Sequence, residues 1–309
     1  MQAAPEDVLV DVPIPYMERT RAYYRALGYA EPYRWAHFAE VPFARLAKPL
    51  AECRIGLATT AVLYDPAKGD QGPGAPYNAA AKFHRVYAAG TGGTPDTRIA
   101  HVTYDRTHTS AIDANCWFPL AQLKRCAELG LIGAVSPRFY GVPTTRSQRS
   151  TLERDAPELL ALAREDAVDA MILVPNCPIC HQTMSLAARH LEAAGIPTVI
   201  LGCAKDIVEH AGVPRFLFSD FPLGNACGKP LDSGSQIFTI DLAFELLAMA
   251  PAPRTTIQSP LRWSADAAWK RDFCRSENLS EADRARLRAA HEDHRATAQA
   301  GRESMRGET

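Results

Sequence analysis

The sequence predicts an α/β fold of the Rossmann-like type, in which a mostly parallel sheet has helices on both faces and a C-terminal helical extension follows. Residues 170–174 are a continuous apolar run, AMILV, as in strands that are buried on both faces of a parallel sheet. A helical pattern follows over 181–194 and stops at Gly195, a residue suited to the left-handed backbone at a helix end. A second apolar run, 196–201, comes next. Strand, helix and strand in this order form a βαβ unit, whose crossover is almost always right-handed.

The other elements are predicted from the same kinds of pattern, taken along the chain. Apolar runs indicate strands at residues 53–62, 98–104, 132–136 and 216–218. Apolar residues at helical spacing indicate helices at 16–24, 119–129, 153–166 and 235–250, and a charged helix is expected from Ser280 onward. Residues 66–78 are rich in glycine and proline and are predicted to be a loop.

Changes in composition divide the chain into three parts. Residues 1–50 are irregular and contain several aromatic side chains, which we interpret as an N-terminal arm. Residues 51–250 carry the alternating strands and helices of the α/β domain. Residues 251–309 are polar apart from two tryptophan anchors, and they are predicted to form a helical extension that ends in a disordered tail.

The composition excludes several functional classes. Of the 309 residues, 47% are hydrophobic and 22% are charged, and the formal net charge of −1 offers no basic field for a nucleic acid. The glycine-rich residues 89–94 lack the Gly-Lys-Ser/Thr ending of a phosphate loop, so no dinucleotide site is expected. No apolar stretch is long enough to span a bilayer, and the first residues lack the pattern of a secretory signal. We therefore expect a cytoplasmic protein that binds neither nucleic acid nor membrane, and a homo-oligomer is compatible with the sequence.

The chain has eight cysteines, and two of them form a Cys-x-x-Cys pair, Cys177 and Cys180, just after the predicted strand 170–174. In open α/β sheets, ligands bind beyond the carboxyl ends of the strands, where such loops lie. A helix N-terminus carries roughly half a positive charge, which stabilises a thiolate and lowers the cysteine pKa below its usual value of about 8.5. His181 follows the pair directly and is a candidate to pair with the thiolate or to carry a proton. The pattern predicts a redox-active dithiol with Cys177, Cys180 and His181 as catalytic residues.

The residues leave two other interpretations open. Cys203 ends the next predicted strand and Cys227 lies in a later loop. Together with Cys177 and Cys180 they are candidate ligands of zinc or of an iron–sulfur cluster. In the other interpretation the chain is not an enzyme and binds a partner protein through its aromatic arm or its charged tail. For His181, a capping role competes with catalysis.

A second group of polar residues lies at the predicted carboxyl ends of other strands. His101, Tyr104 and Asp105 follow one strand, and Thr59 and Thr60 end another. We predict that these five side chains bind a polar substrate, with His101 and Asp105 the better candidates for a general acid. Asp105 is equally suited to a turn, and the two threonines to capping of the backbone.

Three segments in a fixed order carry a resemblance to a known family. Residues 54–61 read RIGLATTA, residues 101–133 contain the pattern His-x-x-Tyr-Asp, Asp-x-Asn, Phe-Pro-Leu and Gly-x-Ile-Gly, and residues 166–203 contain the Cys-x-x-Cys pair. In this order they resemble the glycine, sarcosine and betaine reductase selenoprotein B family, which also includes the selenocysteine-bearing subunit of D-proline reductase. The resemblance covers the predicted α/β domain.

The resemblance implies reductive chemistry in which a thiol or selenol attacks the substrate and a disulfide is the oxidised product. In the selenoprotein members, a selenocysteine stands three residues before the Cys-x-x-Cys pair. That position is Val174 here, so the chain is similar to a cysteine-only member that keeps an intact dithiol. The substrates of the selenoprotein members therefore do not follow for this chain. The need for their pyruvoyl-bearing partner subunit is weakened, and the sequence leaves open whether a partner subunit is required.

From these observations we expect a thiol-dependent oxidoreductase that has no bound cofactor and acts on a small-molecule substrate. The sequence leaves open whether Cys177 or Cys180 is the attacking thiolate, and Cys177 is favoured because it lies earlier in the turn and is expected to be more exposed. The other cysteine of the pair then resolves the adduct and leaves a disulfide. A thioredoxin-like electron donor restores the dithiol.

Overall fold

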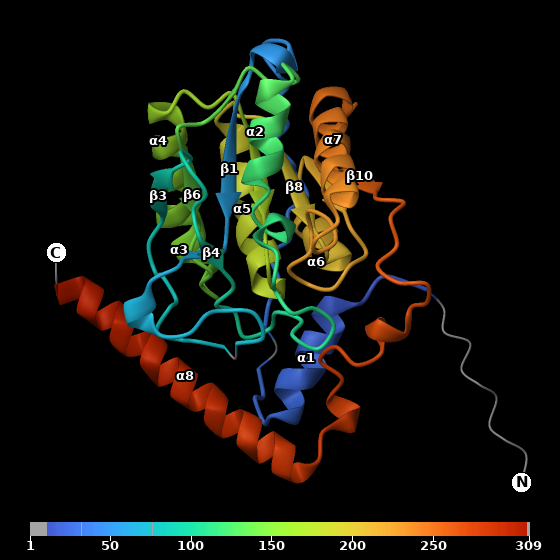
Figure 1. Cartoon of the computed structure of the whole chain (residues 1–309). Coiled ribbons are helices and arrows are strands. Elements are labelled where there is room, and N and C mark those ends of the chain that lie inside the picture. The colour runs from blue at the N-terminus through green and yellow to red at the C-terminus, as the bar shows by residue number, and fades with distance from the viewer. Residues whose placement is uncertain (1–10, 32, 76, 308–309) are drawn as a thin grey trace, which may run out of the picture.

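The architecture is known from a computed structural model that describes residues 11–31, 33–75 and 77–307 (Figure 1). Its centre is an eight-stranded sheet with the order β10-β9-β8-β7-β1-β6-β3, in which β5 also pairs with β1. Neighbouring strands are parallel except at one edge, where β3 runs antiparallel to β6. The predicted α/β fold with a mostly parallel sheet is confirmed.

The bounds of the elements are as follows. The strands of the main sheet are β1 (Arg54–Thr59), β3 (Tyr87–Gly90), β5 (Ala134–Val135), β6 (Arg138–Gly141), β7 (Ala170–Val174), β8 (Thr198–Gly202), β9 (Arg215–Phe218) and β10 (Thr255–Gln258). A small separate sheet pairs β2 (Val62–Leu63) with β4 (Thr97–Arg98). The α-helices are α1 (Tyr16–Ala26), α2 (Leu120–Glu128), α3 (Gln148–Ser150), α4 (Ala156–Glu165), α5 (Pro178–Ala193), α6 (Lys205–Ala211), α7 (Ser233–Met249) and α8 (Glu281–Gly307). A π-helical turn, Thr151–Asp155, joins α3 to α4, and 3-10 turns lie at Leu50–Glu52, Pro66–Lys68, Ala114–Cys116, Ala268–Lys270 and Ser276–Asn278.

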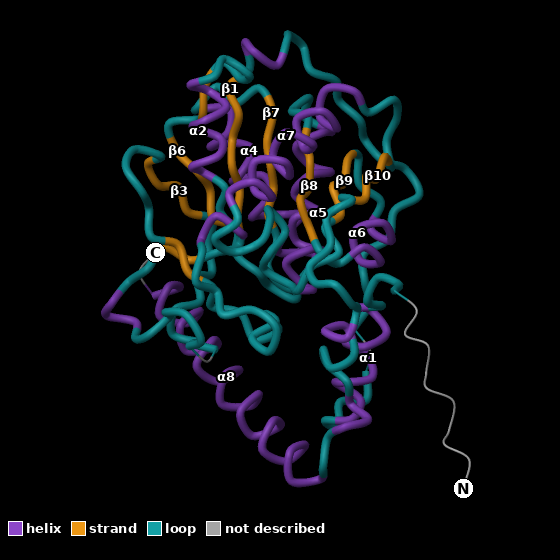
Figure 2. Tube along the Cα trace, turned by 45° about the vertical axis from the view of Figure 1, so that its right-hand side comes forward, coloured by secondary structure: helices purple, strands orange, loops and turns teal. Residues whose placement is uncertain are grey.

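Helices cover both faces of the sheet and divide its core in two. Strand β7 is buried along its whole length, and its side chains alternate between the faces. Ile172 and Val174 pack with α2 and α7 on one face, whereas Met171 and Leu173 pack with α4 and α5 on the other. Full burial of such a side chain stabilises the fold by about 1.5–3 kcal/mol. The continuous apolar run in the sequence thus reflects a central strand without an exposed face (Figure 2).

Two predicted features of the outer strands differ from the structure. A strand was expected over 98–104, but only Thr97–Arg98 pair with another strand. The chain then turns, because the Asp105 carboxylate accepts the backbone N–H groups of Thr107 and His108. The strand Thr255–Gln258 pairs with β9, so the sheet extends beyond the boundary predicted at residue 250.

The C-terminal extension is helical over a longer stretch than expected. Helix α8 continues to Gly307 and runs as a single long rod across the end of the molecule where α1 lies (Figure 1). The disordered tail expected for the last dozen residues stays a prediction, and residues 308 and 309 lie outside the described part of the chain. Among the described residues, no helix combines the length and the apolar character needed to cross a membrane.

The N-terminal arm lies along α5 and is held there by several contacts, including hydrogen bonds near both ends of the helix. Near the start of α5, the side-chain oxygen of Gln182 accepts the N–H of Ala36 at 2.7 Å. Near its end, the buried Glu192 carboxylate accepts the N–H of Ala44 at 2.6 Å and forms an ion pair with Arg215 at 2.8 Å. Arg215 in turn donates to the carbonyl oxygen of Ala44 at 2.6 Å. The arm is thus fixed beside the helix that begins at the Cys-x-x-Cys pair.

Gly141 in β6 is required because the ring of Tyr87 on the neighbouring strand lies directly over it. A Cβ at this position would meet ring carbons at 1.9 Å, and the ring is held in place by a hydrogen bond from its hydroxyl to the carbonyl oxygen of Ala61. We expect Gly141→Ala to lower the free energy of unfolding by about 1–3 kcal/mol through overpacking. Urea denaturation measures this change. Gly90→Ala is the control, because a Cβ at Gly90 would meet no atom within 4 Å; equal midpoints for the two variants would contradict the prediction.

Candidate active site

The Cys-x-x-Cys pair lies where β7 ends and α5 begins, as predicted, and its two cysteines form a disulfide. Cys177 is the N-cap residue of α5, and its sulfur accepts the backbone N–H of Cys180 at 3.2 Å. Pro178 occupies the first turn of the helix, where its missing N–H is not needed. Helix α5 therefore starts three residues before the predicted start at His181. Cys177 is 4% exposed and Cys180 is fully buried, so the more accessible sulfur is that of Cys177.

The two threonines expected to bind substrate instead support the backbone of this turn. The Thr60 hydroxyl oxygen accepts the backbone N–H of Asn176 at 3.2 Å and its side-chain NH₂ at 3.0 Å. Thr59 donates its hydroxyl to the carbonyl oxygen of Trp117 at 3.2 Å. Both threonines are fully buried, and neither lines the cavity beside the disulfide. Thr59 and Thr60 therefore cap the backbone, which is the alternative role that the sequence had left open for them.

His181 is also engaged with the backbone rather than with the sulfur atoms. Its Nδ1 lies 2.7 Å from the carbonyl oxygen of Cys177, and its Nε2 accepts the N–H groups of Cys203 at 2.9 Å and Ala204 at 3.2 Å. Burial lowers the pKa of His181 to about 4, so its ring is neutral near pH 7. The ring is fully buried and joins the start of α5 to the loop after β8. The geometry therefore gives the predicted catalytic histidine a structural role.

His101, by contrast, lies beside the disulfide. A ring nitrogen of His101 and the two sulfur atoms lie within 4.8 Å of one another. The ring is 9% exposed, and its buried Nδ1 has no hydrogen-bond partner. Burial, together with the positive charges of Lys82 and Arg106, lowers the pKa of His101 to about 3, so the imidazole is neutral next to the disulfide. Of the predicted substrate-binding residues, this is the one that the structure brings to the cysteine pair.

A cavity of about 90 Å³ adjoins this group. Its walls come from α1, from the loop between β2 and β3, from the loop after β4, from the segment after β6 and from the first turn of α5. The lining residues are Thr20, Tyr24, Tyr77, Lys82, Ala100, His101, Val102, Thr103, Thr144, Arg146, Cys177, Pro178 and Ile179. Cys177 and His101 are thus reachable from the cavity, whereas the sulfur of Cys180 lies behind them against the Thr144 hydroxyl at 3.4 Å.

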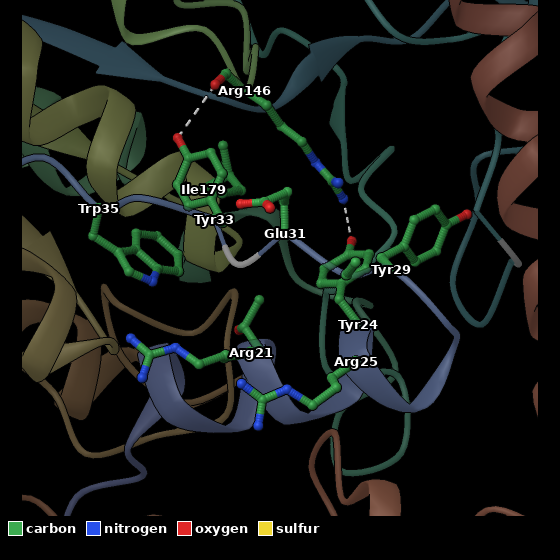
Figure 3. Close-up of a pocket in the computed structure, with 11 residues that line it drawn as sticks. Arg21, Tyr24, Arg25, Tyr29, Glu31, Tyr33, Trp35, Arg146 and Ile179 are labelled. Atoms are coloured by element: carbon green, nitrogen blue, oxygen red, sulfur yellow. Dashed lines mark hydrogen bonds between the residues drawn. The ribbon is translucent and has the colours of Figure 1, made fainter.

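A second cavity of about 150 Å³ shares four wall residues with the first and is built mainly from the N-terminal arm. Figure 3 shows Arg146 reaching across it to the hydroxyl of Tyr24, while the carbonyl oxygen of Arg146 accepts the hydroxyl of Tyr33 at 3.4 Å. The Arg146 guanidinium also lies 4.6 Å from the centre of the Tyr24 ring. The other residues that Figure 3 labels are Arg21, Arg25, Tyr29, Glu31, Trp35 and Ile179. Three guanidinium groups against one carboxylate favour an anionic group in this space, and the aromatic rings favour an apolar one.

Tyr104 and Asp105 are not part of this site. The Asp105 carboxylate contacts Nδ1 of His108 at 3.0 Å and caps the turn described above. Tyr104 is buried and lines a different, much smaller cavity together with Trp117. Asp105 therefore stabilises a turn, which is the alternative role that the sequence had left open for it.

The four cysteines proposed as metal ligands are not brought together. Among the described residues, the group that could hold a metal ion consists of His101, Cys177 and Cys180, without Cys203 or Cys227. Cys203 and Cys227 are buried free thiols. Burial raises the pKa of Cys203 to about 12 and that of Cys227 well above its usual value. The structure therefore gives no geometric support to a site built from all four cysteines.

Sequence reasoning did not find the contribution of the arm or of Arg146. The aromatic character of residues 16–43 was visible, but nothing in their spacing indicates that they pack against the start of α5. Arg146 lies in an irregular segment after β6 and belongs to no recognisable motif. The contacts that bring these residues together join positions more than a hundred residues apart, such as Arg146 and Tyr24.

Comparison with known proteins shows which proteins this chain is similar to. No protein-family model matches it, and no solved structure matches it. The D-proline reductase subunit gamma of Acetoanaerobium sticklandii is 26% identical over 221 residues, which are 71% of this chain and 88% of the relative. The glycine reductase complex component B subunit gamma of Symbiobacterium thermophilum is 25% identical over 207 residues, which are 65% of this chain and 47% of the relative.

A third relative, the betaine reductase complex component B subunit beta of Peptoclostridium acidaminophilum, is 25% identical over 132 residues, 41% of this chain and 30% of the relative. The chain thus spans most of the D-proline reductase subunit and less than half of the glycine and betaine reductase subunits. These matches agree with the motifs noted in the sequence. The chain is thus a homologue, at 25–26% identity, of proteins named as subunits of D-proline, glycine and betaine reductases.

Proposed function

We propose that this chain is the dithiol-bearing component of a reductase, and that it reductively cleaves a small substrate while Cys177 and Cys180 become a disulfide. The observation that carries the proposal is the Cys177–Cys180 disulfide at the start of α5, with Cys177 and His101 both lining one cavity. The family adds support, because the relatives are named as subunits of reductases and reductase complexes. Val174 stands at the end of β7 with its side chain in the core, so the nucleophile has to be a cysteine.

In this proposal Cys177 is the nucleophile and Cys180 the resolving thiol. Cys177 lines the cavity, and its sulfur accepts a backbone N–H at the positive end of α5, which favours the thiolate. Cys180 is fully buried behind it. A substrate in the cavity therefore meets the sulfur of Cys177 first.

The proposed reaction proceeds in two displacements. The Cys177 thiolate attacks the substrate carbon that carries a leaving group, so a carbon–sulfur bond forms and the bond to the leaving group breaks. The leaving group departs with its electron pair and takes up one proton. The Cys180 thiolate then attacks the Cys177 sulfur, the disulfide forms, and the carbon leaves with the bonding pair and takes up the second proton. In sum, the substrate gains two electrons and two protons, and the dithiol loses them.

His101 is the group placed to hold a proton in these steps. Its imidazole is neutral beside the disulfide, as described above. A thiolate within about 4–6 Å stabilises an imidazolium, so the pKa of His101 should rise once the pair is reduced. The ring can then take the thiol proton of Cys177 and return it to the departing group.

The disulfide has to be reduced before the next turnover. An external dithiol of the thioredoxin type supplies two electrons and two protons by exchange through a mixed disulfide. Such a cycle requires no bound cofactor. Because the relatives act within multi-subunit reductases, further protein partners are expected as well.

The proposal is tested by equilibrating the full chain in redox buffers and mapping the free thiols by mass spectrometry. We expect the 177–180 disulfide to reduce reversibly, with a potential of about −200 to −270 mV. The reduced protein is then incubated with D-proline, glycine, betaine and other small amines, and loss of the two thiols is followed together with product formation.

The matched control is Cys203→Ser, which removes a buried thiol outside the cavity and should leave the potential unchanged. A 177–180 pair that stays oxidised in every buffer, or that never reacts with any electrophile through Cys177, would overturn the proposal. Oxidation of the dithiol that depends on one of the small compounds would identify the substrate.

A further inference from the structure

The group formed by His101, Cys177 and Cys180 has a second chemical capacity. Two sulfur atoms and a ring nitrogen lie within 4.8 Å of one another. Independently of the cysteines, the Nδ1 atom of His101 is buried and has no hydrogen-bond partner, although buried polar atoms in proteins are nearly always paired. While the disulfide is intact, no group near this nitrogen in the described part of the chain satisfies it.

We propose that, once the disulfide is reduced, Cys177, Cys180 and His101 bind a thiophilic divalent cation such as Zn²⁺. Two thiolates and one imidazole are ligands of the type that zinc prefers, whereas magnesium and calcium prefer carboxylate and carbonyl oxygens. The disulfide form offers no thiolate, so the site exists in the reduced protein alone. The inference rests on the proposed function in one respect, which is that the disulfide can be reduced.

Zinc binding requires reduction of the disulfide and loss of the two thiol protons. A dithiol or phosphine reductant gives two electrons, the S–S bond breaks, and two protons complete the two thiols. Zn²⁺ then displaces both thiol protons, so the complex of the ion with two thiolates and a neutral imidazole carries no net charge. Zinc release and two-electron oxidation by a disulfide return the protein to its present state.

The local geometry suits a tetrahedral ion. Zinc lies about 2.3 Å from sulfur and about 2.0–2.1 Å from nitrogen, which places two sulfur ligands and one nitrogen ligand about 3.5–3.8 Å apart at the tetrahedral angle. The three ligand atoms are already within 4.8 Å, so side-chain rotations bring them into range. The N–H of Cys180 points at the Cys177 sulfur, and the Thr144 hydroxyl lies 3.4 Å from the Cys180 sulfur, so both thiolates have a nearby donor.

Three protein ligands leave the fourth position open toward the cavity. Lys82 and Arg146 are in its wall, so a water molecule or an anion is the expected fourth ligand. A bound ion would occupy both thiolates and block their attack on a substrate. Zinc would thus compete with catalysis and also protect the dithiol from oxidation.

The test uses the full chain, reduced with a phosphine, freed of reductant under anaerobic conditions, and titrated with Zn²⁺ against a chromophoric chelator. We expect one equivalent to bind the reduced protein, and binding to the disulfide form to be at least about a hundredfold weaker. In His101→Ala and in the size-matched His101→Gln, affinity should fall by at least about tenfold, the lower limit for a lost contact in a metal site. Titration with Co²⁺ should give thiolate-to-metal charge transfer and visible bands of tetrahedral cobalt, and the bands should change in both variants.

His108→Ala is the matched control, because His108 pairs with Asp105 outside the cavity. Its zinc affinity and cobalt spectrum should equal those of the unmodified chain, as should those of Cys203→Ser. The inference is overturned if the reduced protein binds no zinc, or if both His101 variants bind it as tightly and with the same cobalt spectrum. Free thiols are counted on each sample. If the Cys177–Cys180 pair is reduced and reoxidised but binds no zinc, this inference alone is overturned. If the pair cannot be reduced, the proposed function is overturned as well.

Discussion

Cys177→Ser is expected to slow the reaction of the reduced protein with electrophiles and disulfides by at least about a thousandfold, whereas Cys180→Ser should trap the covalent adduct. Loss of the attacking group in enzymes that use covalent intermediates costs this much or more. Cys177 lines the cavity and receives the N–H of Cys180, whereas Cys180 is fully buried, so the remaining thiol cannot replace it. In Cys180→Ser the adduct forms but lacks the thiol that would release it.

Mass spectrometry of the intact chain after reaction with an aromatic disulfide distinguishes the two variants. Cys180→Ser should carry one added group at Cys177, and Cys177→Ser none within the same time. Cys203→Ser should behave as the unmodified chain does. If Cys177→Ser reacted at the unmodified rate and Cys180→Ser did not accumulate the adduct, the order of the two cysteines proposed here would have to be reversed.

His181→Ala is expected to lower the free energy of unfolding by about 2–5 kcal/mol. The change removes a fully buried ring. It also leaves the carbonyl oxygen of Cys177 and the N–H groups of Cys203 and Ala204 without their side-chain partner. Urea denaturation at pH 7 measures the effect. His190→Ala is the control, since His190 lies in the last turn of the same helix and is only partly buried.

The same residue should make stability depend on pH in a defined direction. The pKa of His181 is about 4 in the folded chain and about 6.5 when unfolded, so the unfolded chain binds the proton more readily. The stability that the neutral ring contributes is therefore complete above about pH 6.5 and is lost as the pH falls toward 4. From this group alone the loss is about 3 kcal/mol. In His181→Ala the decline between pH 6.5 and 4 should be smaller; an equal slope in both proteins would contradict the assignment.

The sequence alone was sufficient for the central βαβ unit and for the place of the cysteine pair, because both depend on local patterns. The apolar run of β7, the helix after it and the Cys-x-x-Cys turn are contiguous in the chain. The direction of His181 was not predictable in the same way. A residue next to a reactive cysteine in sequence lies about 100° around the helix from its neighbour. Here that angle turns the ring toward the end of β8, where its Nε2 accepts the N–H groups of Cys203 and Ala204.

For His101 the outcome is the reverse of that for His181. The sequence pattern identified His101 as a candidate site residue, but its spacing from Cys177 and Cys180 in the chain does not predict that it contacts them. It lies in an irregular segment that was expected to be a strand, and the turn at Asp105 decides where the segment goes. The cavity walls depend on contacts between distant parts of the chain. Patterns of one sequence indicate local elements well, whereas such contacts are set by packing of the whole fold.

The attachment of the N-terminal arm to α5 has a consequence for how the protein is made. The bond between Ala36 and Gln182 joins residues 146 positions apart, and that between Ala44 and Glu192 joins residues 148 apart. Because a ribosome synthesises the chain from its N-terminus, the arm leaves the exit tunnel well before the helix it lies against exists. The cavity in front of Cys177 is therefore completed only after α5 has been synthesised, and a nascent chain that ends at Asn176 carries ten of the thirteen lining residues and neither of the paired cysteines.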